Sequence, residues 1–120
     1  NWFKDKIMTN NVLNLAGQTD INELATIMKN ATCNIVPDSG SMHIGHTMES
    51  KIIAIYGPTD YERTRPIGNN VKFVFSKNKN LGIMKNYRMT ELEVYEKYEN
   101  KIMDEVDIDE ILTLIEYYIK

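Results

Sequence analysis

The sequence predicts an α/β fold in which a parallel sheet is flanked by helices. Short β-branched runs alternate with stretches of helical periodicity along the chain. The run KIIAIY at 51–56 is almost continuously apolar, which is typical of a strand covered on both faces, as strands of parallel sheets are. The expected order is strand, helix, strand, helix, strand, loop, strand and then helices, and this alternation favours parallel pairing.

Four short apolar runs are the expected strands. They lie at 11–15, 33–36, 51–56 and 71–75. The first is stopped by Ala16-Gly17, and the third by the turn residues GPTD. The segment YERTRPIGNN, which precedes the last run, is long for a connection in a compact domain, and we expect it to be a loop that lines a site.

Two helices are expected between these strands. Asp20 followed by Glu23 forms a capping box, and helical apolar spacing continues to about Asn30. A shorter helix is expected from Ser41 to about Glu49. Gly45 lies inside it and weakens it by up to about 1 kcal/mol relative to alanine. Packing therefore has to offset the glycine.

The last third of the chain is expected to be helical. Capping boxes at Thr90/Glu93 and Asp107/Glu110 mark two helix starts, and residues 84–89 are expected to form a linker before them. The final helix carries an amphipathic stripe. Its members are Ile108, Ile111, Leu112, Leu114, Ile115 and Ile119.

Composition and charge exclude several classes of protein. A chain of 120 residues with 42% hydrophobic and 26% charged residues fits one ordered domain. The net charge of −3, with scattered Lys and Arg, gives no electrostatic basis for binding nucleic acid. No apolar run approaches the roughly 20 residues that span a bilayer, so we expect an intracellular protein. Cys33 has no internal disulfide partner, and we expect a buried thiol without a role.

Residues 38–46, DSGSMHIGH, are the candidate site. They follow the run CNIV, and ligands of open parallel sheets bind beyond the carboxyl ends of the strands. If a helix begins near Ser41, its first amides are unpaired and can bind a phosphate. Gly40 would let a diphosphate approach, while Ser39, Ser41 and His43 could donate hydrogen bonds to it. Asp38 is an acceptor and suits sugar hydroxyls better.

Ordinary structural explanations fit the same residues, and spacing alone favours them. Asp38 or Ser39 can be a simple N-cap, Gly40 a turn residue and His43 a hydrogen-bonded core side chain. His43 and His46 share a helical face, but no carboxylate or cysteine follows at the spacing a metal site needs. GSMHIG is neither a P-loop nor G-x-G-x-x-G, and the nucleophile elbow G-x-S-x-G is absent.

Residues 15–60 as a string resemble the C-terminal domain of glycosyltransferase family 9, the lipopolysaccharide heptosyltransferases. The resemblance lies in four ordered pieces: LAG-x-T, a helix with ELA, D-[ST]-G-x-x-H after a strand, and G-P-[TS]-D after the next strand. Together they span about a third of the chain, and their order makes the match more specific than any one piece. The chain departs from the family in IGHTM, where an alanine-rich stretch is common, and in Ser50-Lys51, where glycine and proline often stand.

The resemblance implies one Rossmann-like half of a two-domain GT-B glycosyltransferase. The donor would be a nucleotide-sugar, usually ADP-heptose, and the acceptor a lipopolysaccharide-type glycolipid, with inverting transfer and no metal. By position, Asp38, Ser39, Gly40 and His43 match the family's residues around the diphosphate and sugar. Thr19 falls in the loop that meets the adenine, and Gly57, Pro58 and Thr59 match the loop that lines the cleft.

The resemblance also implies that residues 1–120 are a donor-binding domain without the N-terminal acceptor domain. The family's catalytic carboxylate belongs to that other domain, so no catalytic residue is expected in this chain, and the chain alone is expected to be inactive. A cytoplasmic enzyme with peripheral association at the inner face of the bacterial inner membrane is implied. Two alternatives stay open: a sugar-nucleotide epimerase of the same general fold, and a non-catalytic α/β binding module.

Overall fold

The computed structural model describes residues 11–87, 90–98 and 101–120. Three strands form one sheet in the order β1-β2-β3, and both pairs are parallel. The strands are β1 (Asn34–Pro37), β2 (Ile52–Tyr56) and β3 (Val71–Phe75). This parallel sheet with its flanking helices confirms the α/β, Rossmann-like prediction.

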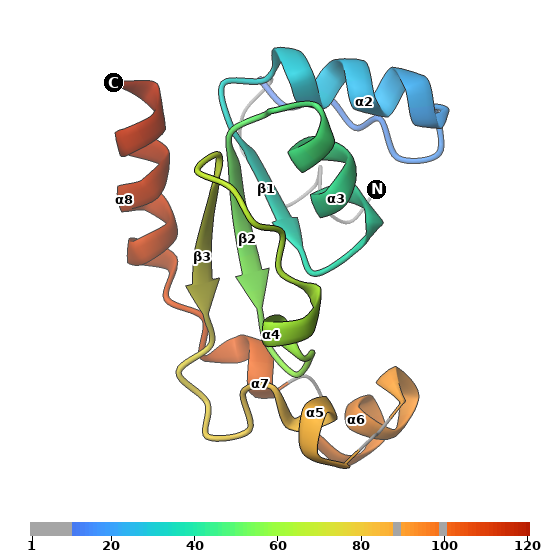
Figure 1. The fold of residues 1–120 in the computed structure, drawn as a ribbon, viewed down its shortest axis with the longest axis vertical. Helices are drawn as coiled ribbons and strands as arrows, with labels where there is room; N and C mark the ends of the chain where they lie inside the picture. The colour runs from blue at the N-terminus through green and yellow to red at the C-terminus, as the bar shows by residue number, and fades with distance from the viewer. Residues whose placement is uncertain (1–10, 88–89, 99–100) are drawn as a thin grey trace.

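Three helices cover the two faces of the sheet. They are α2 (Ile21–Asn30), α3 (Gly40–Thr47) and α8 (Ile108–Ile119). α3 packs on β1 and β2 with α2 beside it, whereas α8 packs on β2 and β3 from the other side. Four short helices lie toward the carboxyl ends of the strands (Figure 1). These are α4 (Tyr61–Thr64), α5 (Ile83–Tyr87), α6 (Glu91–Tyr98) and α7 (Lys101–Asp104).

The core follows the alternation of side chains along the central strand. Ile52, Ala54 and Tyr56 point toward α2 and α3, while Ile53 points toward α8. All four are fully buried. β2 is therefore covered on both faces, as its continuous apolar sequence predicts.

Gly45 allows the close packing of α3. A Cβ built on it would lie 2.7 Å from Met28 Cε of α2 and 3.0 Å from Ile52 Cδ1 of β2. The glycine thus lets α3 lie close to both elements, and this close packing offsets its low helix propensity.

The predicted helix starts are largely confirmed. Asp20 caps α2 in a complete capping box with Glu23, and Thr90 and Glu93 exchange the same pair of bonds at α6. At α8 the box is only half formed. Asp107 accepts from the amides of Asp109 and Glu110, but among the described bonds the Glu110 side chain accepts none from the Asp107 amide. The other carboxylate oxygen of Asp107, Oδ2, is bonded to Lys77 Nζ at 2.5 Å.

The predicted strand at 11–15 is wrong. These residues have no regular structure, and Leu13 is 76% exposed. An apolar run becomes a strand only when a neighbouring backbone pairs with it, and the described sheet contains three strands, with β1 at one edge. The run's composition is therefore not sufficient to make it a strand.

Two predicted irregular segments contain helices. Residues 61–64 form α4, and Asp60 accepts backbone bonds from Arg63 and Thr64. The expected linker at 84–89 is largely wrong, because 83–87 form α5; residues 88–89 lie outside the described part. α5 begins just after Gly82, which has a φ of +67° and donates to the carbonyl of Gly57. Its position is fixed by this long-range bond.

The predicted stripe of α8 is only partly buried. Ile111 is buried, and Leu114 and Ile115 pack against the same cluster. Ile108, Leu112 and Ile119 stay exposed. The buried Tyr118 takes a place in the core that the stripe did not include. Cys33 packs against this cluster but is only half-buried, so the predicted buried thiol is found in part.

Candidate functional site

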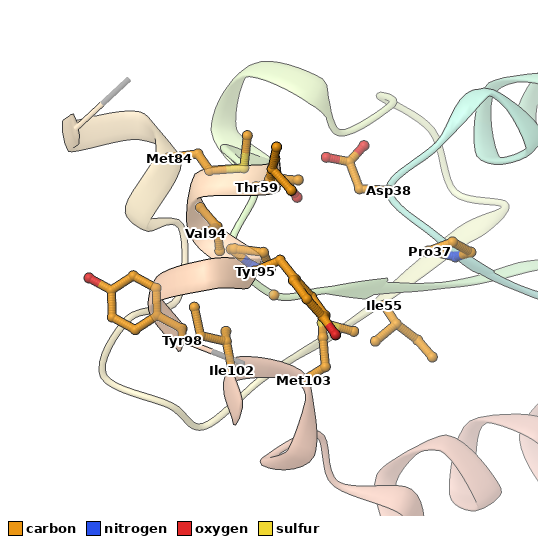
Figure 2. A pocket seen from close by; sticks show the side chains of 13 residues that line it. Pro37, Asp38, Ile55, Thr59, Met84, Val94, Tyr95, Tyr98, Ile102 and Met103 are labelled. Carbon is orange, nitrogen blue, oxygen red and sulfur yellow. The ribbon is translucent and has the colours of Figure 1, made fainter. Parts of the chain in front are cut away.

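A pocket of about 560 Å³ lies at the carboxyl ends of β1 and β2. Asp38 follows β1 directly, and Gly57, Pro58 and Thr59 follow β2, so four of the predicted site residues line one pocket. Figure 2 shows the carboxylate of Asp38 in the same part of the pocket as Thr59. The parallel pairing of the two strands brings these segments together.

The rest of the pocket is apolar. Pro37 of β1 and Ile55 of β2 contribute to it, and its other side chains come from helices late in the chain (Figure 2). Its wall contains side chains from α5, α6 and α7, including two tyrosines. These residues are Met84, Leu92, Val94, Tyr95, Tyr98, Ile102 and Met103. The sequence pattern does not reveal them as site residues, because their apolar spacing is that of any amphipathic helix. The site thus combines a polar corner with a wide apolar wall.

The loop after β2 is held in place by backbone bonds to α5. Gly82 N donates to Gly57 O at 2.9 Å, and Met84 N donates to Pro58 O at 3.0 Å. Gly57 is buried, and a Cβ on it would overlap Met103 Sδ of α7. Gly57 therefore allows α7 to close over the strand end, which is a packing role beside any contact with a ligand.

Asp38 is held by a chain of hydroxyl groups. Thr64 Oγ1, at the end of α4, donates to Asp38 Oδ2 at 2.8 Å. Tyr56 Oη lies 3.3 Å from Thr64 Oγ1 and 3.5 Å from Met42 Sδ. Burial raises the pKa of the Tyr56 phenol, and the nearby Asp38 carboxylate raises it further against the opposing effects of Thr64 and Arg65. Tyr56 is therefore a protonated donor at neutral pH.

The first amides of α3 are open. Ser39 is the N-cap, but its side chain caps no amide; its hydroxyl lies 2.7 Å from the hydroxyl of Ser41. Within the described part of the chain, no group accepts a bond from the amides of Gly40 and Ser41. A Cβ on Gly40 would meet no described atom within 4 Å. The position therefore has free amides, open space on the side where a Gly40 Cβ would lie, and the positive end of a helix dipole.

Two buried oxygen atoms in the loop after β2 lack partners among the described residues. They are Thr59 Oγ1 and Asp60 Oδ1. Such atoms carry a desolvation cost when nothing bonds to them. Thr59 lines the pocket beside Asp38, but its Oγ1 is buried in this conformation, so its side chain would have to rotate about χ1 before a bound molecule could bond to that oxygen.

The remaining predicted site residues do not line this pocket. His43 is exposed on α3. Thr19 lines a separate hollow of about 480 Å³ between the loop at 15–19 and α2, which shares no residue with the first. Ser39, Gly40 and Ser41 follow Asp38 in the chain but do not line the pocket. The predicted set thus forms a pocket, an adjoining helix terminus and a distant loop.

The second histidine of the cluster has a structural partner. His46 Nδ1 lies 3.1 Å from Asn70 Oδ1, and Asn70 Nδ2 donates to Ser50 O at 2.8 Å. Because the amide nitrogen of Asn70 is already used as a donor, His46 Nδ1 carries the proton in this bond. Across the described ranges, no group of three or more His, Cys, Asp or Glu side chains could hold a metal ion.

None of the helices in the described residues is both long enough and apolar enough to cross a membrane. A parallel sheet with ligand-accessible groups at its strand ends and a free helix N-terminus beside them defines the chain as a Rossmann-like α/β protein. The sequence model of glycosyltransferase family 9 (heptosyltransferase) matches residues 4–94. Because this match covers well over half of the chain, the chain belongs to that family.

Individual relatives match a shorter part. The lipooligosaccharide heptosyltransferase 2 of Haemophilus influenzae is 37% identical over 62 residues, which are 52% of this chain and 18% of that protein. The lipopolysaccharide core heptosyltransferase OpsX of the same organism is 33% identical over 67 residues, or 54% of this chain and 19% of that protein. The lipopolysaccharide heptosyltransferase 2 of Escherichia coli K12 is 26% identical over 61 residues, or 51% and 18%.

The matched segment therefore spans less than a fifth of these relatives. No solved structure matches the chain.

Proposed function

We propose that this chain is the donor-binding part of an inverting glycosyltransferase. The donor is a nucleotide-sugar, ADP-heptose by family, and the acceptor is a lipopolysaccharide-type glycolipid bound by another part of the enzyme. Membership of glycosyltransferase family 9 and the names of the relatives support this proposal. The full protein is then a cytoplasmic enzyme that meets its acceptor at the inner face of the inner membrane.

The observation that carries the proposal is the open N-terminus of α3. The amides of Gly40 and Ser41 have no acceptor among the described groups, and a Gly40 Cβ would meet no described atom from beyond its chain neighbours and its own helix backbone. Two amides and the helix dipole suit the diphosphate of the donor. The neighbouring Ser39 and Ser41 hydroxyls, which now bond each other, can turn to donate to it.

The polar corner of the pocket suits the sugar. In the described chain only Thr64 donates to the carboxylate of Asp38, so Oδ1 is left to accept from sugar hydroxyls. Thr59 Oγ1 adds a hydroxyl without a partner among the described residues. The tyrosine side chains of α6 provide an apolar surface for the C–H face of a sugar ring.

These positions give the chain a specific role in the reaction. The acceptor hydroxyl attacks the anomeric carbon, the bond from that carbon to the diphosphate oxygen breaks, and the electron pair leaves with ADP. The proton of the acceptor passes to a carboxylate in another part of the enzyme. Negative charge grows on the departing diphosphate, and the amides at the start of α3 stabilise it more in the transition state than in the bound donor.

Titration of the isotope-labelled 120-residue chain with ADP tests the proposal. We expect weak, saturable shifts of the Ser39, Gly40 and Ser41 amide signals, followed by His43, and no sugar transfer by the chain alone. Matched additions of AMP, which lacks the diphosphate, should shift these amides less. Unchanged amide signals at millimolar ADP would contradict the proposal and leave a plain helix cap as the function of the cluster.

The full protein separates the two enzyme classes. A transferase needs an acceptor to consume the sugar of its donor, whereas an epimerase changes the sugar without one. Product analysis of the full protein with and without a glycolipid acceptor therefore distinguishes them, and an altered ADP-sugar formed without acceptor would favour the epimerase.

A further inference from the structure

The side chain of Thr64 connects α4 to the candidate donor site. Its Oγ1 lies 2.8 Å from Asp38 Oδ2, although 26 residues separate the two in the chain. It also lies 3.1 Å from Asp60 O and 3.3 Å from Tyr56 Oη. A threonine hydroxyl has one proton and two acceptor sites, so these three contacts cannot all take its proton.

The donor directions in this group follow from chemistry. The carboxylate of Asp38 is the closest and the only charged acceptor, so it takes the Thr64 proton in a charge-assisted bond. Tyr56 is fully buried and can then donate to Thr64 Oγ1. The phenol of Tyr56 has one proton and two acceptors, Thr64 Oγ1 at 3.3 Å and Met42 Sδ at 3.5 Å. A thioether sulfur is the weaker acceptor, so the bonds run from Tyr56 through Thr64 to Asp38.

This arrangement fixes one oxygen of Asp38 and leaves the other free. The Asp38 side chain is half-buried, and Thr64 is its one hydrogen-bond donor among the described residues. Without that bond, the carboxylate could rotate about its side-chain dihedral angles. Because Thr64 ends α4, the segment that follows β2 sets the orientation of a side chain that follows β1.

We propose that Thr64 is a positioning residue, which orients Asp38 so that Oδ1 accepts from the sugar of the donor. This inference rests on the proposed function for the role of Asp38, and it assigns a residue outside the D-S-G-x-x-H and G-P-T-D segments. Tyr56 supports Thr64 from the buried side of the sheet. The aromatic contacts of Tyr56 with Tyr61, at a centroid distance of 6.2 Å, keep α4 against the strand end.

The test uses Thr64→Val and Thr64→Ser. Valine keeps the branched shape and loses the hydroxyl, whereas serine keeps the hydroxyl and loses the methyl group. In the labelled 120-residue chain, three-bond couplings from the Asp38 carboxyl carbon to its backbone nitrogen and carbonyl carbon report the rotamer of Asp38. We expect one rotamer in the wild type and in Thr64→Ser, and averaged couplings in Thr64→Val. Wild-type couplings in Thr64→Val would overturn the inference.

Affinity for two probes gives the second measurement. We expect Thr64→Val to weaken binding of ADP-glucose by about fivefold, or about 1 kcal/mol, and binding of ADP by less than about twofold. The reason is that only ADP-glucose carries, beyond its diphosphate, a sugar whose hydroxyl groups would reach Asp38. Thr64→Ser should restore the ADP-glucose affinity. An equal loss of affinity for ADP-glucose and ADP would mean that Thr64 has only a structural role, and it would overturn the inference.

The two proposals fail in different ways. If the wild type binds neither probe, the proposed function fails, while the couplings of Asp38 still decide whether Thr64 orients it. If ADP binds and the couplings do not change in Thr64→Val, only the positioning inference fails. Should Thr64→Val lose the wild-type amide spectrum, Thr64→Ala carries the same measurements.

Discussion

The phenol oxygen of Tyr118 lies 3.3 Å from the carbonyl oxygen of Ile52. It is also 3.3 Å from the carbonyl oxygen of Asn70, so the last turn of α8 is joined to the starts of β2 and β3. Lys51 Nζ donates to the carbonyl of Tyr118 at 3.1 Å. It adds a positive charge beside the last turn of α8, which contains no basic residue before the C-cap Lys120. α8 is thereby positioned across the sheet by polar bonds at its end as well as by its apolar contacts.

Tyr118→Phe should lower the free energy of unfolding at pH 7 by about 1 kcal/mol, since it removes a buried hydroxyl with two acceptors. Urea denaturation measures the loss. Tyr95→Phe, at an exposed position of α6, is the control and should stay near the wild type. An unchanged midpoint for Tyr118→Phe would mean that the two bonds of its phenol contribute nothing to stability.

The chain should lose stability at alkaline pH. Burial raises the pKa of both the Tyr56 and the Tyr118 phenols, while unfolded tyrosine titrates near about 10. Above that pH the unfolded chain loses protons that the folded chain retains, so the contribution is complete below about pH 10 and is lost as pH rises through the raised pKa values. Unfolding at pH 8 to 11.5 should reveal this fall, with a smaller slope in Tyr118→Phe. The same slope in both proteins would contradict the assignment.

Gly40→Ala should separate ligand binding from folding. A Cβ at this position meets no described protein atom, so stability should change by less than about 0.5 kcal/mol. The methyl group enters open space beside the free α3 amides, where the proposed function requires the diphosphate to approach, and we expect ADP affinity to fall by about tenfold. Thr47→Ala, at the other end of α3, should leave ADP affinity unchanged. If Gly40→Ala bound ADP with wild-type affinity, this result would contradict binding of the diphosphate at the N-terminus of α3.

Substitution of Gly45, unlike that of Gly40, is predicted to change stability. Gly45→Val should destabilise the chain by about 1–3 kcal/mol, because its side chain would overlap Met28 and Ile52 in the core. Gly45→Ala should cost less, since the end of the Met28 side chain can move and alanine raises helix propensity. Thermal unfolding of both variants checks the order. Equal stability of the two would mean that α3 can shift away from the sheet.

Thr59→Val tests the unpartnered hydroxyl beside Asp38. Removing a buried oxygen without a described partner should leave the free energy of unfolding unchanged or raise it by up to about 1 kcal/mol. ADP-glucose should bind about threefold more weakly, because the sugar loses one hydrogen bond. Thr59→Ser keeps the oxygen and should retain affinity. A clear loss of stability in Thr59→Val would indicate a structural bond at this hydroxyl.

Much of the fold could be predicted from the sequence because its signals are local. The capping box of Asp20 and Glu23 spans three residues, and the continuous apolar run of β2 describes burial on both faces. Apolar composition failed at 11–15, where the described chain supplies no pairing strand. Sequence periodicity also did not separate the buried from the exposed apolar residues of α8, because it does not show which of them the sheet covers.

The position of the candidate site was also predictable, since the polar cluster follows a strand and precedes a helix. Its shape was not. The apolar wall comes from α5, α6 and α7, and Thr64 reaches Asp38 across 26 residues. No spacing rule encodes such contacts, because they depend on how the loops after β2 and β3 turn.

The order of the residues alone specifies the kinds of elements, their succession and the family to which they belong. These properties depend on neighbouring residues, whose backbone preferences and polar caps act within one or two turns. Only the three-dimensional packing decides that the first amides of α3 stay open and that Met28 packs closely against Gly45. It also decides that Thr64 hydrogen-bonds to Asp38. Such relations arise when distant segments compete for the same space and the same hydrogen bonds.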